Sequence, residues 1–184
     1  MKYAMAFGLF SACLLVAACS EHGGNHSGGA HVLNGGVQLG NGQITLHTWN
    51  ASVATISANG DFQIEQQAVS TTPAVRDLLK SYYTNVQSIH ADSVATDKAG
   101  EAMGDQISQA VKTQLDNGHP DQIGKAVEGQ TKPLVQAALK VCQDMNVIKA
   151  TQDQLVSQFP AFKPYGNIVS ASDISDCKSD IHAP

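Results

Sequence analysis

The side chains with the widest chemistry in this 184-residue sequence are four cysteines and seven histidines. A thiolate can be acylated, oxidised to a disulfide or bound to a metal, and an imidazole can move a proton or bind a metal. Cys13 and Cys19 lie near the start of the chain, whereas Cys142 and Cys177 lie far along it. The surrounding segments decide which of these reactions each thiol undergoes.

An apolar stretch begins after Lys2 and ends in the sequence LVAAC at residues 15–19. It is shorter than the roughly 20 residues that cross a bilayer, and small residues at its end are typical of a cleaved export signal. The layout resembles the signal and lipobox of a bacterial lipoprotein, which implies that residues 1–18 are removed and that Cys19 is lipidated. An ordinary secretory signal with a chance cysteine is the alternative.

The lipobox resemblance also implies an address. Ser20 follows the lipidated cysteine, and in enterobacterial lipoproteins a serine there resembles the default signal for the outer membrane. Two or more acyl chains give a stable membrane anchor. We therefore expect a protein that is held by its lipid on the periplasmic face of the outer membrane.

The later cysteines form an even pair once the first two are assigned. In an oxidising compartment, Cys142 and Cys177 are expected to form a disulfide. In the chain-entropy model, closing this loop stabilises the fold by about 3–4 kcal/mol. Two free thiols or half of a metal site are the alternatives. A zinc site made of cysteines would need a second CxxC pair, which the spacing does not offer.

Residues 19–36 are rich in Gly, Ser, Asn and His and predict a flexible tether. His22, His26 and His31 could trap Zn, Ni or Cu weakly, because imidazole suits these ions. A polar linker that happens to contain histidine is the interpretation we favour, because a mobile segment loses entropy on closing around a metal. We therefore expect no resident metal.

The composition argues against several classes of function. The formal net charge is −5 and the one arginine is Arg76, whereas nucleic acids and phosphorylated ligands are usually bound by clustered cations. The sequence also lacks GxSxG, HExxH, Walker and GxGxxG motifs. We expect no nucleic-acid partner, no cofactor, no catalytic residues and no enzymatic activity.

A few other residues in the folded part could contact a ligand. His47 and Trp49 are an exposed ligand contact or ordinary strand positions, and His90 is a buried base or a half-exposed helix residue. Three carboxylates repeat every fourth residue and form an acidic ridge that could attract Ca²⁺ or simply face solvent: Asp97, Glu101 and Asp105. Carboxylates at this spacing lack the enclosing oxygen cage that calcium prefers, which favours solvent.

Residues 43–69 predict an antiparallel β-meander of three short strands. Ile44 and Leu46 alternate with polar residues, as Phe62 and Ile64 do later. The dipeptide at 59–60, Asn-Gly, accepts positive φ at both positions and predicts a two-residue hairpin turn. The apolar face of such a sheet must be covered by the helices that follow.

The helical region is predicted to begin at Thr72-Pro73, where Thr caps the helix and Pro fits its first turn. Apolar residues at alternating spacings of four and three then predict one long helix to about 116, or two helices with a break near 93–100. The sequence at 117–120 predicts a stop, a short helix at 121–130 follows, and a new helix begins at 131–133 and ends before Pro160. It should pack antiparallel to the first helix.

From residue 54 onward the pattern resembles a known family. The resemblance rests on Ala54-Thr55-Ile56, Asn59-Gly60, Phe62, Ile64, Val69, Arg76, Leu78, Leu79 and Tyr82, with the stretch from 150–153 to 160–162. They resemble the YggN-like family of proteobacterial envelope proteins of unknown function, and especially its lipoprotein members from xanthomonad-type bacteria. The resemblance implies a small β-meander and an extended helical region. It implies no catalytic residues.

The sequence thus predicts an α+β protein in four parts: a signal at 1–18, a tether at 19–36, a domain at 37–166 and a tail at 167–184 that Cys177 fixes to the last helix. We expect a non-catalytic envelope lipoprotein that contacts the membrane through its lipid and binds a protein or an envelope component. The alternative is a lipoprotein that binds a metal or small ligand through its histidine-rich tether.

Overall fold

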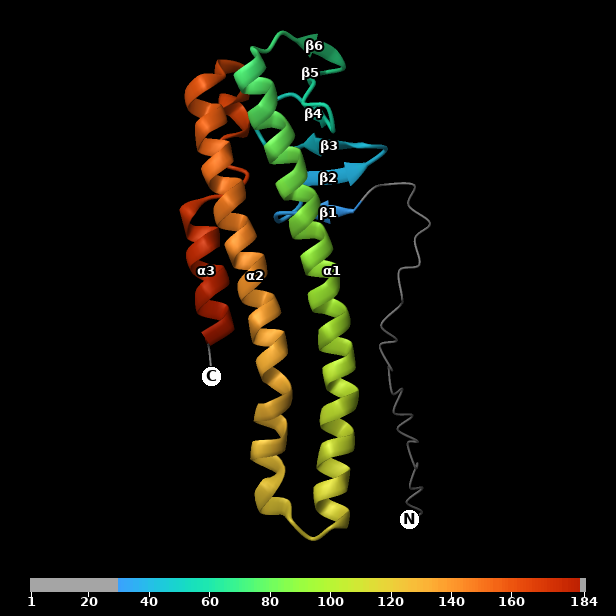
Figure 1. Cartoon of the computed structure of the whole chain (residues 1–184). Coiled ribbons are helices and arrows are strands. Elements are labelled where there is room, and N and C mark those ends of the chain that lie inside the picture. Colours follow the sequence, from blue (N-terminus) through green and yellow to red (C-terminus); the bar gives the residue numbers. More distant parts are fainter. Residues whose placement is uncertain (1–29, 183–184) are drawn as a thin grey trace, which may run out of the picture.

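The computed structural model describes residues 30–182, which form an antiparallel sheet followed by a helical region (Figure 1). The α+β prediction is confirmed. The strands are β1 (His31–Val32), β2 (Val37–Gly40), β3 (Gln43–Leu46), β4 (Ala54–Ser57), β5 (Phe62–Ile64) and β6 (Gln67–Val69). The helices are α1 (Pro73–Asp116), η1 (Pro120–Gln122), α2 (Ile123–Gln158), η2 (Pro160–Tyr165) and α3 (Ala171–His182), of which η1 and η2 are short 3-10 helices.

The sheet is a six-stranded meander in which each strand pairs with the next one in sequence. Ile44 faces Ile56 and Leu46 faces Ala54 across the β3–β4 pair, and all four are buried. The opposite face carries a row of uncharged polar side chains that crosses four strands: Gln38, Thr45, Thr55 and Gln63. One face therefore covers the core, as the alternation predicts.

The meander begins earlier and has more strands than the sequence predicts. The tether is predicted to extend to residue 36, but residues 31–36 belong to a hairpin in which β1 pairs with β2. The turn of this hairpin takes left-handed φ angles at Leu33, Asn34 and Gly35, a conformation that Gly accepts readily and Asn tolerates. The glycine and asparagine of this segment, which predict a linker in the sequence, therefore form a hairpin turn in the structure.

The β4–β5 connection also differs from the prediction. It spans Ala58–Asp61 instead of two residues, and Gly60 takes the positive φ, at 75°. A Cβ at Gly60 would collide with the carbonyl oxygen of Arg76. The loop thus uses glycine to bring the end of the sheet directly against the first turn of α1.

Helix α1 is a single continuous helix of 44 residues, so its length is roughly 66 Å. Thr72 caps it by accepting a hydrogen bond from the backbone N–H of Val75 at 3.3 Å, and Pro73 occupies its first turn. The predicted apolar stripe is confirmed as the buried face: Val75, Leu79, Tyr82, Val86 and Ile89. The alternative of a break near 93–100 is not observed.

Helix α2 does not begin at 131–133 as predicted but continues from Ile123 through Pro133. Proline lacks the N–H of the helix ladder and crowds the carbonyl four residues before it. Here that carbonyl belongs to Gly129, whose backbone has the greatest freedom to adjust. Thr131 also donates a hydrogen bond to the carbonyl of Glu128 at 3.0 Å, which satisfies a backbone group near the interruption.

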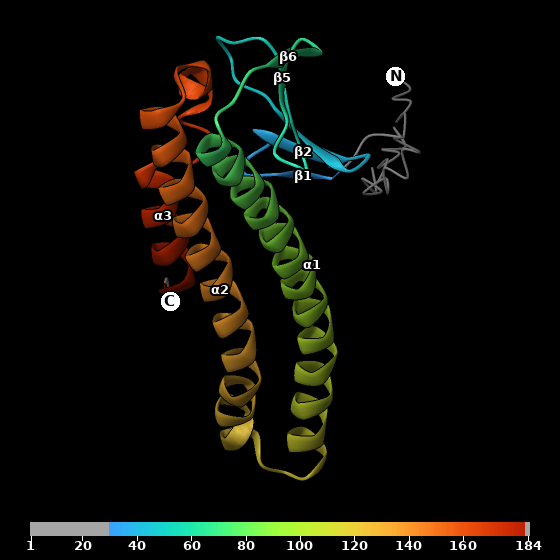
Figure 2. The ribbon, with the colours of Figure 1, turned by 45° about the horizontal axis from the view of Figure 1, so that its top comes forward.

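Helices α1 and α2 lie side by side as a long antiparallel hairpin, with the sheet against one end (Figures 1 and 2). The predicted tail is largely helix α3, which packs on α2. Ser170 and Asp173 cap α3 reciprocally: the N–H of Ser170 donates to Asp173 Oδ2 at 2.8 Å, and the N–H of Asp173 donates to Ser170 Oγ at 3.2 Å.

The core lies between the sheet, the first turns of α1 and the end of α2. Its centre is an aromatic cluster in which Phe62 packs against Phe159 at 5.3 Å between ring centroids and Tyr82 packs against Phe162 at 5.6 Å. At the edge of the core lies the polar side chain of Gln152, which is fully buried. Gln152 donates to the carbonyls of Gly166 and Val169, each at 2.8 Å, and accepts from the N–H of Val169 at 3.1 Å.

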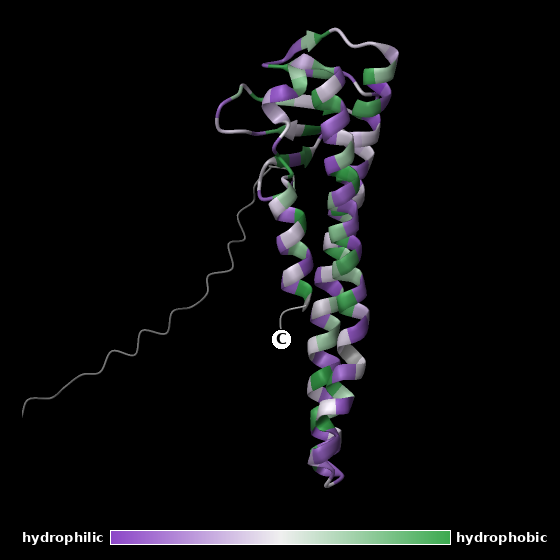
Figure 3. Cartoon of the chain, turned by 90° about the vertical axis from the view of Figure 1, so that its left-hand side faces the viewer, coloured by the Kyte–Doolittle hydropathy of each residue, from purple (hydrophilic) through white to green (hydrophobic). Residues whose placement is uncertain are grey.

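The outer part of the hairpin has no such core. We call residues 90–141 the distal arm. In the part of the arm whose side chains are described, no residue is fully buried, and burial resumes at Cys142. Figure 3 shows apolar patches among polar residues along it. Within residues 30–182, no helix is long and apolar enough to cross a membrane.

Candidate functional site

The predicted lipidation site and most of the tether lie outside the described residues. Cys19, His22 and His26 all precede residue 30, so the lipid anchor stays a prediction. His31, the third tether histidine, is instead part of β1.

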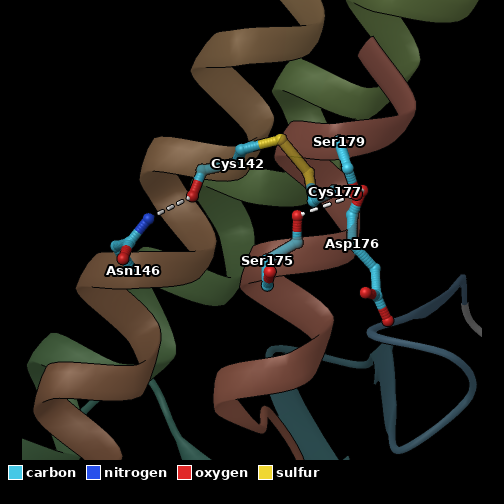
Figure 4. Close-up of a disulfide and its surroundings, with 6 residues drawn as sticks. All are labelled: Cys142, Asn146, Ser175, Asp176, Cys177 and Ser179. Carbon is cyan, nitrogen blue, oxygen red and sulfur yellow. Dashed lines mark hydrogen bonds between the residues drawn. A yellow bond between two sulfur atoms is a disulfide. The ribbon is translucent and has the colours of Figure 1, made fainter. Parts of the chain in front are cut away.

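The predicted disulfide is confirmed. Cys142 on α2 and Cys177 on α3 are bonded, with their Cα atoms 5.8 Å apart (Figure 4). Cys142 is 1% exposed, and its carbonyl accepts a hydrogen bond from the side chain of Asn146 at 2.8 Å. The pair therefore crosslinks the last helix to the hairpin and offers no free thiol for metal binding or catalysis.

Trp49 and His47 are not strand positions, which corrects one of the two interpretations drawn from the sequence. Strand β3 ends at Leu46 because its partner β4 begins at Ala54, so both residues lie on the β3–β4 loop. Trp49 is fully exposed, at 102% relative exposure. Its indole is the largest exposed apolar side chain among the described residues. The loop that carries it is therefore the strongest candidate for a binding site.

An open groove lies beside this tryptophan, and we call it the Trp49 groove. Its walls come from the β1–β2 turn at 33–36, the β3–β4 loop at 47–50 and the segment at 164–173 that joins η2 to α3. It consists of two adjoining hollows of about 470 Å³ each. No Lys or Arg is among the described residues that line it, and its polar side chains are mostly amides and hydroxyls, with one carboxylate from Asp173.

The β3–β4 loop is held at both ends. The N–H of His47 donates to the carbonyl of Gly36 at 2.9 Å, and the hydroxyl of Tyr165 donates to the carbonyl of Ser52 at 2.6 Å. Ser52 Oγ donates to a carboxylate oxygen of Glu65 at 2.7 Å. Burial, with a contribution from the charge of Glu65, raises the pKa of Tyr165, so its hydroxyl remains a hydrogen-bond donor at neutral pH. The loop thus presents Trp49 from a fixed base.

One hydroxyl of the groove has no partner. Thr48 Oγ1 is buried and makes no hydrogen bond within the described structure, although Thr48 lines both hollows. A buried hydroxyl without a partner costs free energy.

A second, smaller groove contains His90 and lies between β1 and the helices. Its volume is about 330 Å³, and His31, Ser93 and Asp97 also line it. No side-chain hydrogen bond joins these four residues, and no group of three metal-ligating side chains occurs in residues 30–182. His90 is half-exposed, which matches the second of its two sequence interpretations.

The acidic ridge does not come together as a site. Asp97 lines the His90 groove, whereas Glu101 and Asp105 point into solvent on the distal arm, and all three are exposed. This is the solvent-facing alternative that the sequence favoured.

A charged cluster that sequence reasoning missed joins α1 to α2 at the base of the distal arm. Lys140 Nζ lies 3.0 Å from Asp92 Oδ2 and 2.7 Å from Asp144 Oδ1. Hydrogen bonds from Asp144 and Lys140 lower the pKa of Asp92, whereas burial raises the pKa of Asp144. The two carboxylates also raise the pKa of Lys140, mainly through hydrogen bonding. The i,i+4 spacing of Lys140 and Asp144 was visible in the sequence, but their partner 48 residues away was not.

Comparisons with known proteins add no relative. No protein-family model matches the chain, and no curated protein or solved structure matches it either.

Proposed function

We propose that this chain is a non-catalytic envelope lipoprotein, anchored through Cys19 on the periplasmic face of the outer membrane, that binds a protein or envelope component in the Trp49 groove. The observation that carries the proposal is the fully exposed Trp49 on a loop fixed at both ends, beside an open polar groove. Pre-organised aromatic anchors of this kind concentrate binding energy in a few residues.

Binding without turnover is supported by where the histidines lie. His47 is on the β3–β4 loop, His90 is on α1 and His119 precedes η1 at the far end of the hairpin. None of these three side chains hydrogen bonds to another side chain in the described structure. Nucleophilic catalysis by a hydroxyl or thiol needs such a base within hydrogen-bond reach of the nucleophile.

A lipid anchor would make weak binding effective. Holding the domain at a membrane raises its local concentration near other envelope components, so modest affinity in the groove is sufficient. Membership of the YggN-like family is part of this proposal. It is supported by the sheet-then-helices architecture that the resemblance implies.

The alternative, metal binding through the tether, has one supporting observation. His31 and His90 both line the second groove, and His31 belongs to the first strand after the tether. Titration of the full chain with Zn²⁺ tests it: binding that is lost in a variant with His22 and His26 replaced by alanine favours this alternative over the first proposal.

Two measurements test the main proposal. Cys19→Ala should leave a heavier precursor or a protein that no longer fractionates with membranes. In cells, a photo-crosslinking residue at Asn167, which lines the Trp49 groove, should capture an envelope component. The same residue at Leu115, which is 56% exposed on the distal arm, serves as the control. Equal capture from both positions, or a wild-type protein that is soluble in the periplasm, contradicts the proposal.

A further inference from the structure

We infer that the Trp49 groove binds a neutral glycan. This inference rests on the proposed function and names the ligand class of the same site. It follows from three features of the groove: an exposed aromatic ring, polar side chains that are free to bond, and the absence of Lys and Arg from its described lining, in which His47 is the one basic residue.

The aromatic ring supplies an apolar platform. A pyranose ring has one face of C–H groups that packs flat against an aromatic ring, while its hydroxyls stay at the edges. Trp49 is the only tryptophan in the chain, and its indole is fully exposed. A protein ligand would instead require a larger apolar patch to cover, because the core of a protein interface is depleted of polar and charged groups.

The polar side chains around the ring suit hydroxyl groups. Asn50 and Asn167 carry amides that both donate and accept, and neither makes a side-chain hydrogen bond in the described structure. Asp173 uses its Oδ2 to cap α3 through Ser170, which leaves Oδ1 as an acceptor. A sugar offers donors and acceptors at this density along its rim.

The charges of the groove select against anions and lipid surfaces. Phosphates and carboxylates are usually bound by Arg or Lys, and neither type is among the described lining residues, whereas Asp173 is negative. A tryptophan that enters a bilayer interface is typically accompanied by basic and apolar neighbours. An uncharged ligand therefore fits better than a phospholipid headgroup or an acidic polymer.

The tryptophan fluorescence of the protein, excited selectively over that of its tyrosines, reports on this site alone, because Trp49 is the single tryptophan. We would reconstitute the full chain in phosphatidylcholine vesicles and titrate it with three neutral tetrasaccharides, those of β-1,4-linked N-acetylglucosamine, β-1,4-linked glucose and α-1,4-linked glucose. At least one should shift the emission saturably, with Kd near or below about 1 mM. The anionic tetramer of galacturonic acid should bind at least about tenfold more weakly than the best neutral sugar.

Variants separate the ring from the fold. By calorimetry, Trp49→Ala should weaken binding at least about tenfold. Trp49→Tyr, which keeps an aromatic face, should stay within a few-fold of the parent. Asn167→Ala should weaken binding without changing the thermal unfolding temperature, and Leu115→Ala on the distal arm is the matched control that should change neither.

Three outcomes would overturn the inference: no emission change with any neutral sugar at about 10 mM, tighter binding of the galacturonate tetramer, or quenching of Trp49 by brominated lipids in the vesicles, which would place the indole in the bilayer. If no sugar binds while crosslinks from position 167 to an envelope protein persist, the glycan inference fails and the proposed function stands. If sugars bind but the chain does not fractionate with membranes, the envelope proposal fails and the glycan inference stands.

Discussion

Removing the buried amide of Gln152 should be the most destabilising change of a single polar side chain in this fold. Its three hydrogen bonds hold the segment after η2 against α2. Gln152→Met keeps the length of the side chain but leaves the N–H and the carbonyl of buried Val169 without partners. Each buried group left unsatisfied costs about 1–3 kcal/mol, so we expect the free energy of unfolding to fall by about 3 kcal/mol.

The assay is equilibrium unfolding in urea with the disulfide intact, read by circular dichroism. Gln152→Ala should lose about 1–2 kcal/mol more than the methionine variant, because it also opens a cavity. Gln154→Met, at an exposed position of the same helix, is the control and should stay within about 0.5 kcal/mol of the parent. Hydrogen exchange at the amide of Val169 should accelerate in the Gln152 variants.

A Gln152→Met protein as stable as the parent would refute this reasoning. It would mean that water replaces the lost partners, and that the segment at 166–169 is not fixed by the glutamine. Because residues 164–173 form one wall of the Trp49 groove, the same variant should also weaken any ligand bound there.

Three further predictions concern the crosslink, the charged cluster and the arm. Replacing Cys142 and Cys177 by serine should lower the free energy of unfolding by about 4 kcal/mol, from the chain entropy of a 35-residue separation; a loss below about 1 kcal/mol in urea unfolding would contradict this. Burial raises the pKa of Asp144 above its ordinary 3.8 in the fold. Protonated Asp144 therefore contributes to the free energy of unfolding below pH 3.8, and this contribution is lost as the pH rises through the folded-state pKa. Asp144→Asn should therefore gain stability relative to the parent as the pH rises above the ordinary value of 3.8, and the opposite trend in a pH series of unfolding curves would refute the assignment. Amides of residues 90–141 should exchange hydrogen faster than those of 75–89, because the arm has few buried contacts; equal protection by mass spectrometry would show that a partner or a second copy covers the arm.

Patterns confined to one element were enough to predict the two layers of the fold. Alternation at Ile44 and Leu46 identifies the buried face of a strand, and the four-three spacing from Val75 to Ile89 identifies the buried face of a helix. Once the lipobox resemblance assigns Cys13 and Cys19, the two remaining cysteines predict the observed pair of Cys142 with Cys177. Each of these signals comes from the spacing of nearby residues or from the number of cysteines, so it can be detected without knowledge of tertiary contacts.

What the sequence missed depends on partners distant in the chain. The β1–β2 hairpin has the composition of a linker, and only the pairing of Val32 with Val37 distinguishes it. Pro133 is an expected helix breaker that Gly129 accommodates. The sequence indicates Trp49 as either an exposed ligand contact or a strand position, and the strand position is wrong because the pairing of β3 with β4 ends at Leu46. The opposite wall of its groove comes from residues 164–173, which no local pattern connects with the loop.

The hydrogen bond from Tyr165 to Ser52 joins residues 113 positions apart, and this separation has a consequence for the order of folding. The meander forms from contacts between strands that are neighbours in sequence, and such contacts close quickly. The base of the β3–β4 loop is fixed only when the segment after α2 arrives. We therefore expect the groove to be assembled last, so a folding intermediate in which residues 164–173 have not yet docked would carry a paired sheet but an incomplete Trp49 groove.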